Sequence, residues 1–221
     1  MTDIRTVLFD LDGTLADTAP DLAYALNRLL LESGRAPLPY EVLRPMASHG
    51  AKGLIGRGFG LTPQDAGYAE LRQRFLDLYA ANLTRATRLF PGIAELLDAL
   101  RSRGIHWGIV TNKPRFLTDP LVQQLGLWDS AACVVSGDTT ANSKPHPEPM
   151  LYACGKAGSL PAQCLYVGDA ARDIEAGRVA GMQTLVALFG YISQDDRPQT
   201  WGASGMISEP REVLQWLSAH E

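Results

Sequence analysis

The feature that most constrains the fold of this chain is the segment of residues 7–15, where an apolar run leads into two carboxylates, Asp10 and Asp12. The apolar run predicts a buried strand of a parallel sheet, and Gly13 marks the point where the chain leaves that strand. Both carboxylates then lie at the carboxyl end of a strand, where open α/β sheets bind their ligands. The segment therefore predicts an α/β fold with an acidic site at the carboxyl end of its sheet.

A similar acidic pattern occurs in calcium-binding loops and in solvated turns. An EF-hand loop places Gly at its sixth position and Glu at its twelfth, between two helices. Counted from Asp10, however, Gly is fourth and Asp21 is twelfth, which excludes that loop. A solvated turn is the default for an isolated pair of aspartates. A functional interpretation therefore depends on the rest of the chain.

Composition indicates an ordinary globular protein. With 221 residues, of which 46% are hydrophobic, the chain is long enough to bury a full core. This length suits one large domain or a domain with an insert. A net charge of −4 gives no field that attracts nucleic acid or an anionic membrane, so we expect neither as a partner. A small metabolite held by local charges fits this composition better.

Hydropathy and cysteine content bear on location. No apolar stretch approaches the roughly 20 residues of a membrane span, and the charged start at Asp3 and Arg5 is unlike a signal peptide. We therefore expect a cytoplasmic protein. The cysteines are odd in number and never spaced as CxxC, which predicts buried free thiols rather than a disulfide or a zinc site. They are Cys133, Cys154 and Cys164.

Hydrophobic periodicity divides the chain into two kinds of segment. Residues 16–88 show helical spacing, for example at Leu22 and Leu26, and contain no convincing strand. In residues 1–15 and 89–221 apolar runs alternate with amphipathic segments, which predicts a doubly wound parallel, Rossmann-like sheet interrupted by a helical insert. The further strands expected are 105–111, 132–136, 164–168 and 182–188. The helices expected are 93–103, 117–125, 147–157 and 173–179.

The later predicted strands also end in polar residues. The second strand leads into Thr111 and Asn112, and a later one leads into Asp169, followed by Asp173 one helical turn on. Lys144 adds a cation in a loop. Each of these residues alone could serve as a helix cap or a solvated charge. Their occurrence in this order at one end of the sheet favours a phosphate-binding site.

These motifs resemble those of the haloacid dehalogenase superfamily, whose phosphatases carry DxDGT, a Thr or Ser after the second strand, a Lys before a later helix, and GDxxxD. All four occur here in order, at residues 10–14, Thr111, Lys144 and residues 168–173. The match covers nearly the whole chain. The helical insert of residues 16–88 resembles the C1 cap of that superfamily, with residues 1–15 and 89–221 as its core.

The resemblance implies a Mg²⁺-dependent phosphatase that forms an aspartyl phosphate. In this assignment Asp10 is the nucleophile, and Asp12 protonates the leaving alkoxide and later deprotonates the hydrolytic water. Asp10, the main-chain carbonyl of Asp12 and Asp169 are the implied Mg²⁺ ligands. Asp173 would orient a metal-bound water.

Phosphate chemistry agrees with these roles. A phosphomonoester dianion repels an attacking carboxylate, so a divalent cation between them is needed to neutralise charge. Magnesium prefers an octahedral shell of oxygen atoms with several waters, which suits a site with few protein ligands. Thr111, Asn112 and Lys144 are implied to hold the phosphoryl oxygens. The expected ligand is a small phosphorylated metabolite.

Substrate choice in capped members depends on the insert. Here residues 48–53 include two glycines that allow close approach to a ligand, and His49, Lys52 and Arg57 are available for an anionic group. We expect His49 or Arg57 to contact the substrate. A structural role for His49 and simple solvation of Arg57 remain the alternatives, and contact by Lys52 is left open.

Within the superfamily the chain is most similar to phosphoglycolate phosphatases and, in particular, to the subgroup that acts on N-acetylmuramic acid 6-phosphate in cell-wall recycling. The residues that carry this similarity are 111–114, 142–149, 189–192 and 201–203. Ala170 departs from the pattern, because many relatives carry a further acidic residue there. The physical properties of the residues do not separate a two-carbon acid phosphate from an amino-sugar phosphate.

Other functions on the same fold stay open to different degrees. Dehalogenation does not need a proton donor, so the presence of Asp12 favours phosphoryl transfer. A phosphotransferase resembling β-phosphoglucomutase and a non-catalytic protein that binds a phosphorylated ligand are the main alternatives. A phosphonate hydrolase would use Lys52 for a Schiff base, which we consider the weaker hypothesis. The residues do not distinguish a monomer from a homodimer.

Overall fold

A parallel sheet forms the centre of the molecule, in a computed structural model that describes residues 3–220. Its strands are β1 (Thr6–Phe9), β4 (His106–Val110), β5 (Val134–Val135), β6 (Cys164–Gly168), β7 (Gln183–Ala187) and β8 (Gly205–Ile207). They follow the order β5-β4-β1-β6-β7-β8, and every neighbouring pair is parallel. The predicted doubly wound α/β sheet is confirmed.

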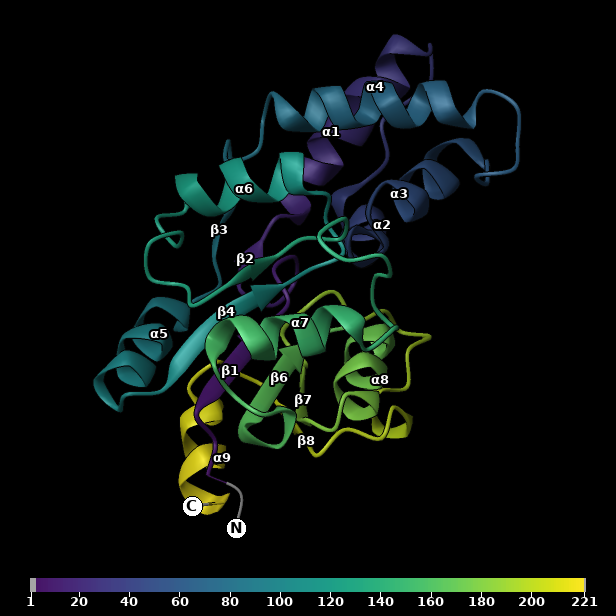
Figure 1. The fold of residues 1–221 in the computed structure, drawn as a ribbon. Helices are drawn as coiled ribbons and strands as arrows, with labels where there is room; N and C mark the ends of the chain where they lie inside the picture. The colour runs from purple at the N-terminus through teal and green to yellow at the C-terminus, as the bar shows by residue number, and fades with distance from the viewer. Residues whose placement is uncertain (1–2, 221) are drawn as a thin grey trace.

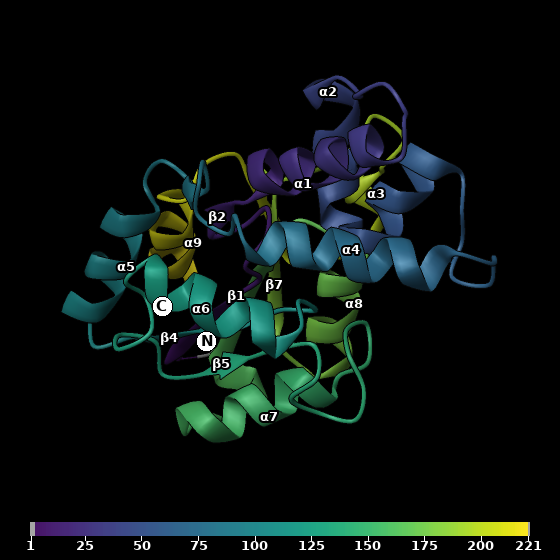
Figure 2. The ribbon, with the colours of Figure 1, turned by 90° about the horizontal axis from the view of Figure 1, so that it is seen from above.

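Alternation of side chains along β1 explains why helices cover both faces of the sheet. Successive side chains of a strand point to opposite faces. Val7 and Phe9 pack with α5, α6 and α9 in the main core, whereas Leu8 packs with α7 and α8 in a second core. Figure 2 shows α7 and α9 on opposite sides of the sheet. These helices are α5 (Ile93–Ser102), α6 (Arg115–Gln124), α7 (Glu148–Ala157), α8 (Ala171–Val179) and α9 (Glu212–His220).

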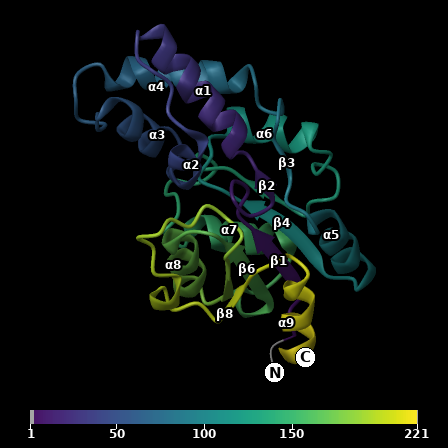
Figure 3. The same cartoon turned by 180° about the vertical axis from the view of Figure 1, so that it is seen from behind.

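The insert leaves and rejoins the core through two short antiparallel strands, β2 (Ala16–Asp17) and β3 (Arg88–Leu89). Its helices lie beyond the carboxyl end of the sheet (Figure 1), and Figure 3 shows α9 at the opposite end. They are α1 (Ala19–Glu32), α2 (Tyr40–Leu43), η1 (Arg44–His49), α3 (Gly50–Phe59) and α4 (Tyr68–Ala80). The expectation of no strand in residues 16–88 was wrong at its two ends, because a two-residue strand is too short to show periodicity.

The predicted elements of the core agree with the observed ones to within a few residues. The strand predicted over 164–168 has those bounds, and the helix predicted over 117–125 begins two residues earlier, at Arg115. The sequence interpretation missed β8 and α9, and the short 3₁₀ turns Pro161–Gln163 and Pro198–Thr200.

Two other expectations concern cysteines and membranes. All three cysteines are free and buried, which confirms the prediction of buried thiols. Within residues 3–220, every helix is too short or too polar to cross a membrane.

Candidate active site

The candidate site lies where β4, β1 and β6 end. Asp10 follows β1, Thr111 follows β4 and Asp169 follows β6, so three neighbouring strands deliver these side chains to one place. The sheet register extends to these residues, since the Asp10 amide donates to the Val167 carbonyl at 2.9 Å. Parallel strands end on the same side of a sheet, which explains why residues about 100 positions apart converge.

Three buried carboxylates meet at this point. Asp10, Asp169 and Asp173 each offer an oxygen, and these oxygens lie within 4.8 Å of one another. The Tyr191 amide donates to Asp169 Oδ2 at 2.7 Å, whereas the buried Oδ1 finds no hydrogen-bond partner among residues 3–220. Burial, together with the charges of Asp173 and Asp10, raises the pKa of Asp169 to about 8. A buried cluster of oxygen ligands with one unpaired oxygen fits a hard divalent cation such as Mg²⁺.

Two glycines allow the chain to pack closely around Asp169. Gly13 has a φ of 84°, which L-residues rarely adopt, and a Cβ atom there would overlap Asp169 Oδ2. A Cβ atom on Gly190 would overlap the Asp169 side chain in the same way. The glycine of the DxDGT motif is therefore needed for space as well as for the turn.

Lys144 places an ammonium group inside the acidic cluster. Its Nζ lies 3.0 Å from Asp10 Oδ1 and 2.7 Å from Asp173 Oδ1, and its side chain is 0% exposed. It also donates to the Val110 carbonyl and to the Tyr166 hydroxyl, each at 2.8 Å. Asp173 in turn accepts a hydrogen bond from the Ala170 amide at 3.0 Å at the start of α8. Lys144 is thus fixed beside the candidate nucleophile.

Asn112 and Thr111 lie in the loop after β4. The Asn112 side chain donates to the Lys144 carbonyl at 2.8 Å and accepts from the Lys144 amide at 3.0 Å. Both of its polar atoms therefore hold the loop that carries Lys144. Thr111 is buried and its hydroxyl oxygen accepts a weaker bond from the Lys113 amide at 3.2 Å.

Lys113 is a site residue to which the sequence interpretation gave no role. Its Nζ donates to Asp12 Oδ1 at 2.7 Å, and the Thr18 hydroxyl donates to the same oxygen at 2.5 Å. The side chain of Lys113 is only 6% exposed. The available signal was its position two residues after Thr111, in a loop already expected to reach the site.

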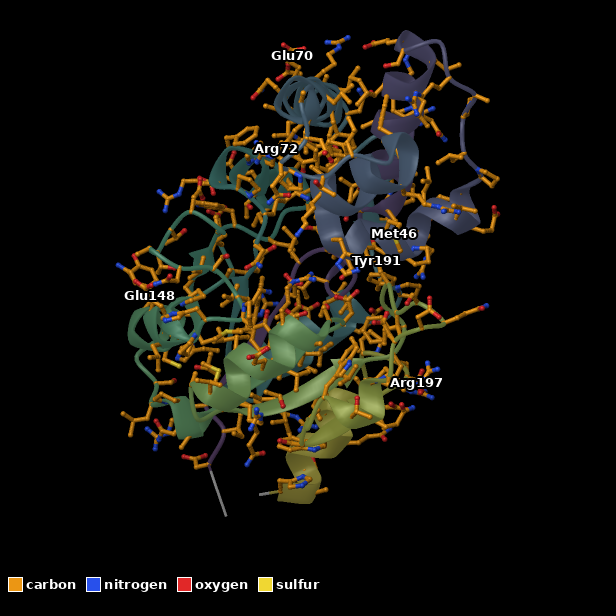
Figure 4. The ribbon with its side chains drawn as sticks, turned by 90° about the vertical axis from the view of Figure 1, so that its right-hand side faces the viewer. Met46, Glu70, Arg72, Glu148, Tyr191 and Arg197 are labelled. Atoms are coloured by element: carbon orange, nitrogen blue, oxygen red, sulfur yellow. The ribbon has the colours of Figure 1, made fainter. Side chains whose placement is uncertain are left out.

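A cavity of about 980 Å³ separates the sheet from the insert. One side, which we call the floor, is formed by Asp10, Asp12, Thr111, Asn112 and Lys113. The other side, which we call the roof, includes His49, Lys52, Arg57 and Arg72. The structure therefore brings His49 and Arg57, and also Lys52, to the same cavity as Asp10, while their contact with a substrate stays a prediction. Arg72, which was not predicted, extends from the side of α4 opposite to Glu70 (Figure 4).

Several contacts join the roof to the core. The Arg172 guanidinium donates to the Ser48 carbonyl at 2.7 Å and also lines the cavity. Arg44 donates to the carbonyls of Gly190 and Phe189 at 3.0 and 3.2 Å. Its guanidinium lies 5.1 Å from the ring centroid of Tyr191, which Figure 4 shows at the junction of insert and sheet. These contacts place the roof over the floor.

Comparison with known proteins identifies the family. Residues 7–187 match the model of the haloacid dehalogenase-like hydrolases. The chain therefore belongs to this family, which confirms the resemblance that the four motifs indicated.

Two relatives and one solved structure show how closely the chain fits the family. The chain is 40% identical to an N-acetylmuramic acid 6-phosphate phosphatase of Pseudomonas putida, over 98% of this chain and 97% of the relative. It is 45% identical to a phosphoglycolate phosphatase of Xylella fastidiosa, over 93% of this chain and 90% of the relative. The crystal structure of a predicted phosphoglycolate phosphatase from Haemophilus somnus matches with a TM-score of 0.86 at 28% identity. The match covers 98% of this chain and 99% of that structure's chain.

Proposed function

We propose that this protein is a phosphatase that hydrolyses a small phosphomonoester through an aspartyl phosphate on Asp10. The observation that carries the proposal is the placement of Asp10 on the cavity floor, with the Lys144 ammonium 3.0 Å from one of its oxygens and two further buried carboxylates beside it. A nucleophilic carboxylate needs nearby positive charge before a phosphate dianion can approach it.

A metal ion completes the charge balance in this proposal. Asp10, Asp169 and the main-chain carbonyl of Asp12 would hold Mg²⁺, with Asp173 next to them. When bound, the ion supplies the positive charge that lets phosphate and carboxylate come together. The unpaired oxygen of Asp169 supports its part in this ligand set.

The other residues at and beneath the floor bind the phosphate and move protons. Lys144 and Thr111 hold phosphoryl oxygens, and the Asn112 side chain keeps the Lys144 loop in place. Asp10 forms a bond to phosphorus as the ester bond breaks. Asp12 gives a proton to the departing oxygen and then takes one from the water that hydrolyses the acyl phosphate.

The roof provides the basis for substrate choice, and we propose that residues 16–88 act as a cap. Lys52, Arg57 and Arg72 lie on it and are exposed. The substrates named for the two relatives, phosphoglycolate and N-acetylmuramic acid 6-phosphate, both carry a carboxylate besides their phosphate. These cations are placed to pair with that group, and a cavity of about 980 Å³ accommodates either molecule.

A substrate panel tests the proposal. Phosphate release is measured with Mg²⁺ from phosphoglycolate, N-acetylmuramic acid 6-phosphate, hexose phosphates and 4-nitrophenyl phosphate, for the wild-type protein and for Asp10→Asn. We expect release that requires Mg²⁺ and disappears in Asp10→Asn, with the highest kcat/KM for one of the two carboxylate-bearing esters. A wild-type protein that releases no phosphate from any ester would refute the proposal.

A further inference from the structure

The buried pair of Lys113 and Asp12 connects the proposed proton donor to the insert. The Lys113 ammonium lies 2.7 Å from Asp12 Oδ1 and 4.6 Å from the centroid of the Tyr79 ring. Tyr79 belongs to α4, the last helix of the insert. Thr18, which donates to the same oxygen of Asp12, immediately precedes α1, the first helix of the insert. Thr18 thus contacts the Asp12 carboxylate directly, and Tyr79 is joined to it through the Lys113 ammonium.

The geometry leaves the second oxygen of Asp12 available. Both hydrogen bonds fall on Oδ1, and within residues 3–220 no hydrogen bond reaches Oδ2. Asp12 lines the cavity. A carboxyl group held by one oxygen can present the other to a substrate in a single orientation.

Lys113 is held as a cation in this position. Burial of an ammonium group is costly unless a counter-charge compensates for the lost water. Here the counter-charge is the Asp12 carboxylate, whose Oδ1 lies 2.7 Å from the Lys113 ammonium. The face of the Tyr79 ring adds a cation–π contact.

We propose that Lys113 is a positioning residue for Asp12. It fixes Oδ1 so that Oδ2 meets the ester oxygen. In the step concerned, an Asp10 oxygen bonds to phosphorus, the ester P–O bond breaks, and the electron pair left on the ester oxygen takes the proton from Asp12. The inference rests on the proposed phosphatase function.

This role predicts a dependence on the leaving group. An alkoxide or a phenolate is a strong base and needs a proton as it departs, whereas 4-nitrophenolate is stable without one. Loss of the Lys113 ammonium should therefore slow the cleavage of phosphoglycolate and phenyl phosphate far more than that of 4-nitrophenyl phosphate.

The test compares kcat/KM for these three esters, with Mg²⁺, in the wild-type protein, Lys113→Met, Lys113→Gln and Lys113→Arg. In Lys113→Met we expect a loss of roughly 100-fold for the two basic leaving groups and less than about 3-fold for 4-nitrophenyl phosphate. Lys113→Arg should restore part of the loss. Lys113→Gln keeps a hydrogen-bond donor without the charge, and it repeats the measurement if the Met variant does not fold.

Lys156→Met is the matched control. Lys156 is also a lysine beside an aromatic ring, 5.3 Å from the centroid of Tyr152, but it is exposed on α7 and does not line the cavity. It should leave all three values unchanged.

Two results would overturn the inference. An equal loss for all three esters would mean that Lys113 only supports the fold. A loss confined to phosphoglycolate, with phenyl phosphate unaffected, would mean that Lys113 binds the substrate carboxylate instead. Failure of the proposed function differs from both, because the wild-type protein would then cleave none of the esters.

Discussion

The floor and the roof of the cavity carry opposite charges and differ in burial. Asp10 of the floor, with Asp169 and Asp173 beneath it, is buried beside the fully buried ammonium of Lys144. On the roof, Lys52 and Arg57 are exposed cations that form no salt bridge within residues 3–220. Buried charges are held in one geometry by their partners, whereas exposed charges can adjust at small cost. Floor residues should therefore determine the chemistry, and roof residues the choice of substrate.

The largest effect is expected from the nucleophile. Asp10→Asn replaces one carboxylate oxygen by an amide nitrogen and removes the negative charge that both nucleophilic attack and metal binding use, so turnover should fall by about 10⁴-fold or more. Phosphate release under saturating Mg²⁺ measures this, and a melting curve verifies that the variant is folded. If the variant keeps at least a tenth of the wild-type turnover, its activation barrier has risen by no more than roughly 1.4 kcal/mol. That result would show that another group is the nucleophile.

A second contrast compares Lys144, which is buried beneath the floor, with Lys52 of the roof. Lys144→Met leaves buried carboxylates without their cation, which should cost about 3–5 kcal/mol of unfolding free energy, since its side chain is 0% exposed. Lys52→Met changes an exposed side chain and should cost less than about 0.5 kcal/mol. Denaturant unfolding of both variants, without added metal, measures the difference. Equal stability of the two variants would contradict the conclusion that the Lys144 ammonium is a buried charge that compensates the carboxylates around it.

Metal and pH should act together on Asp169, which is buried beneath the floor. The pKa of Asp169 is raised from 3.8 to about 8 by burial and by its acidic neighbours. Because the folded-state pKa exceeds the unfolded one, the stability contribution of Asp169 is full below pH ~4 and is lost as pH rises through about 8. A divalent cation relieves the repulsion among the carboxylates, but it competes with the proton for Asp169. The rise in melting temperature on adding Mg²⁺ should therefore grow from pH 5 to pH 8.

Asp169→Asn provides the control for this linkage. The variant lacks the titrating carboxyl group, so most of the pH dependence of the Mg²⁺ effect should disappear. A wild-type protein that gains the same melting temperature from Mg²⁺ at pH 5 and pH 8 would show that Asp169 does not bind the metal.

The smallest effect is expected on the roof. Arg57→Met should raise KM for a carboxylate-bearing ester by about 10-fold, the amount expected for one lost charge-assisted hydrogen bond. It should leave kcat for 4-nitrophenyl phosphate unchanged. Arg197→Met is a suitable control, since Arg197 is exposed and lies outside the cavity lining (Figure 4). A fall in kcat for both esters would place Arg57 in the chemical step and remove the distinction between floor and roof.

Local sequence patterns predicted the elements that build the floor. β6 has its predicted bounds because an apolar run of four residues, 164–167, is followed by Gly168-Asp169, and α5 begins at Ile93, directly after Pro91-Gly92. Such patterns depend on burial and turn chemistry, which act over a few residues. The strands β2 and β3 were missed because their pairing depends on a partner about 70 positions away.

The sequence by itself determined the family, the parallel sheet and the set of acidic and phosphate-binding residues. Three of the four motifs directly follow strands of a parallel sheet, and topology alone brings the ends of these strands to one side. Only the tertiary structure decided how these groups act on one another. Asn112 holds the Lys144 loop, Tyr191 donates to Asp169, and Lys113 reaches Asp12 across 101 positions of the chain. Contacts of this kind depend on how loops from different strands pack, and the spacing of residues within one segment does not contain that information.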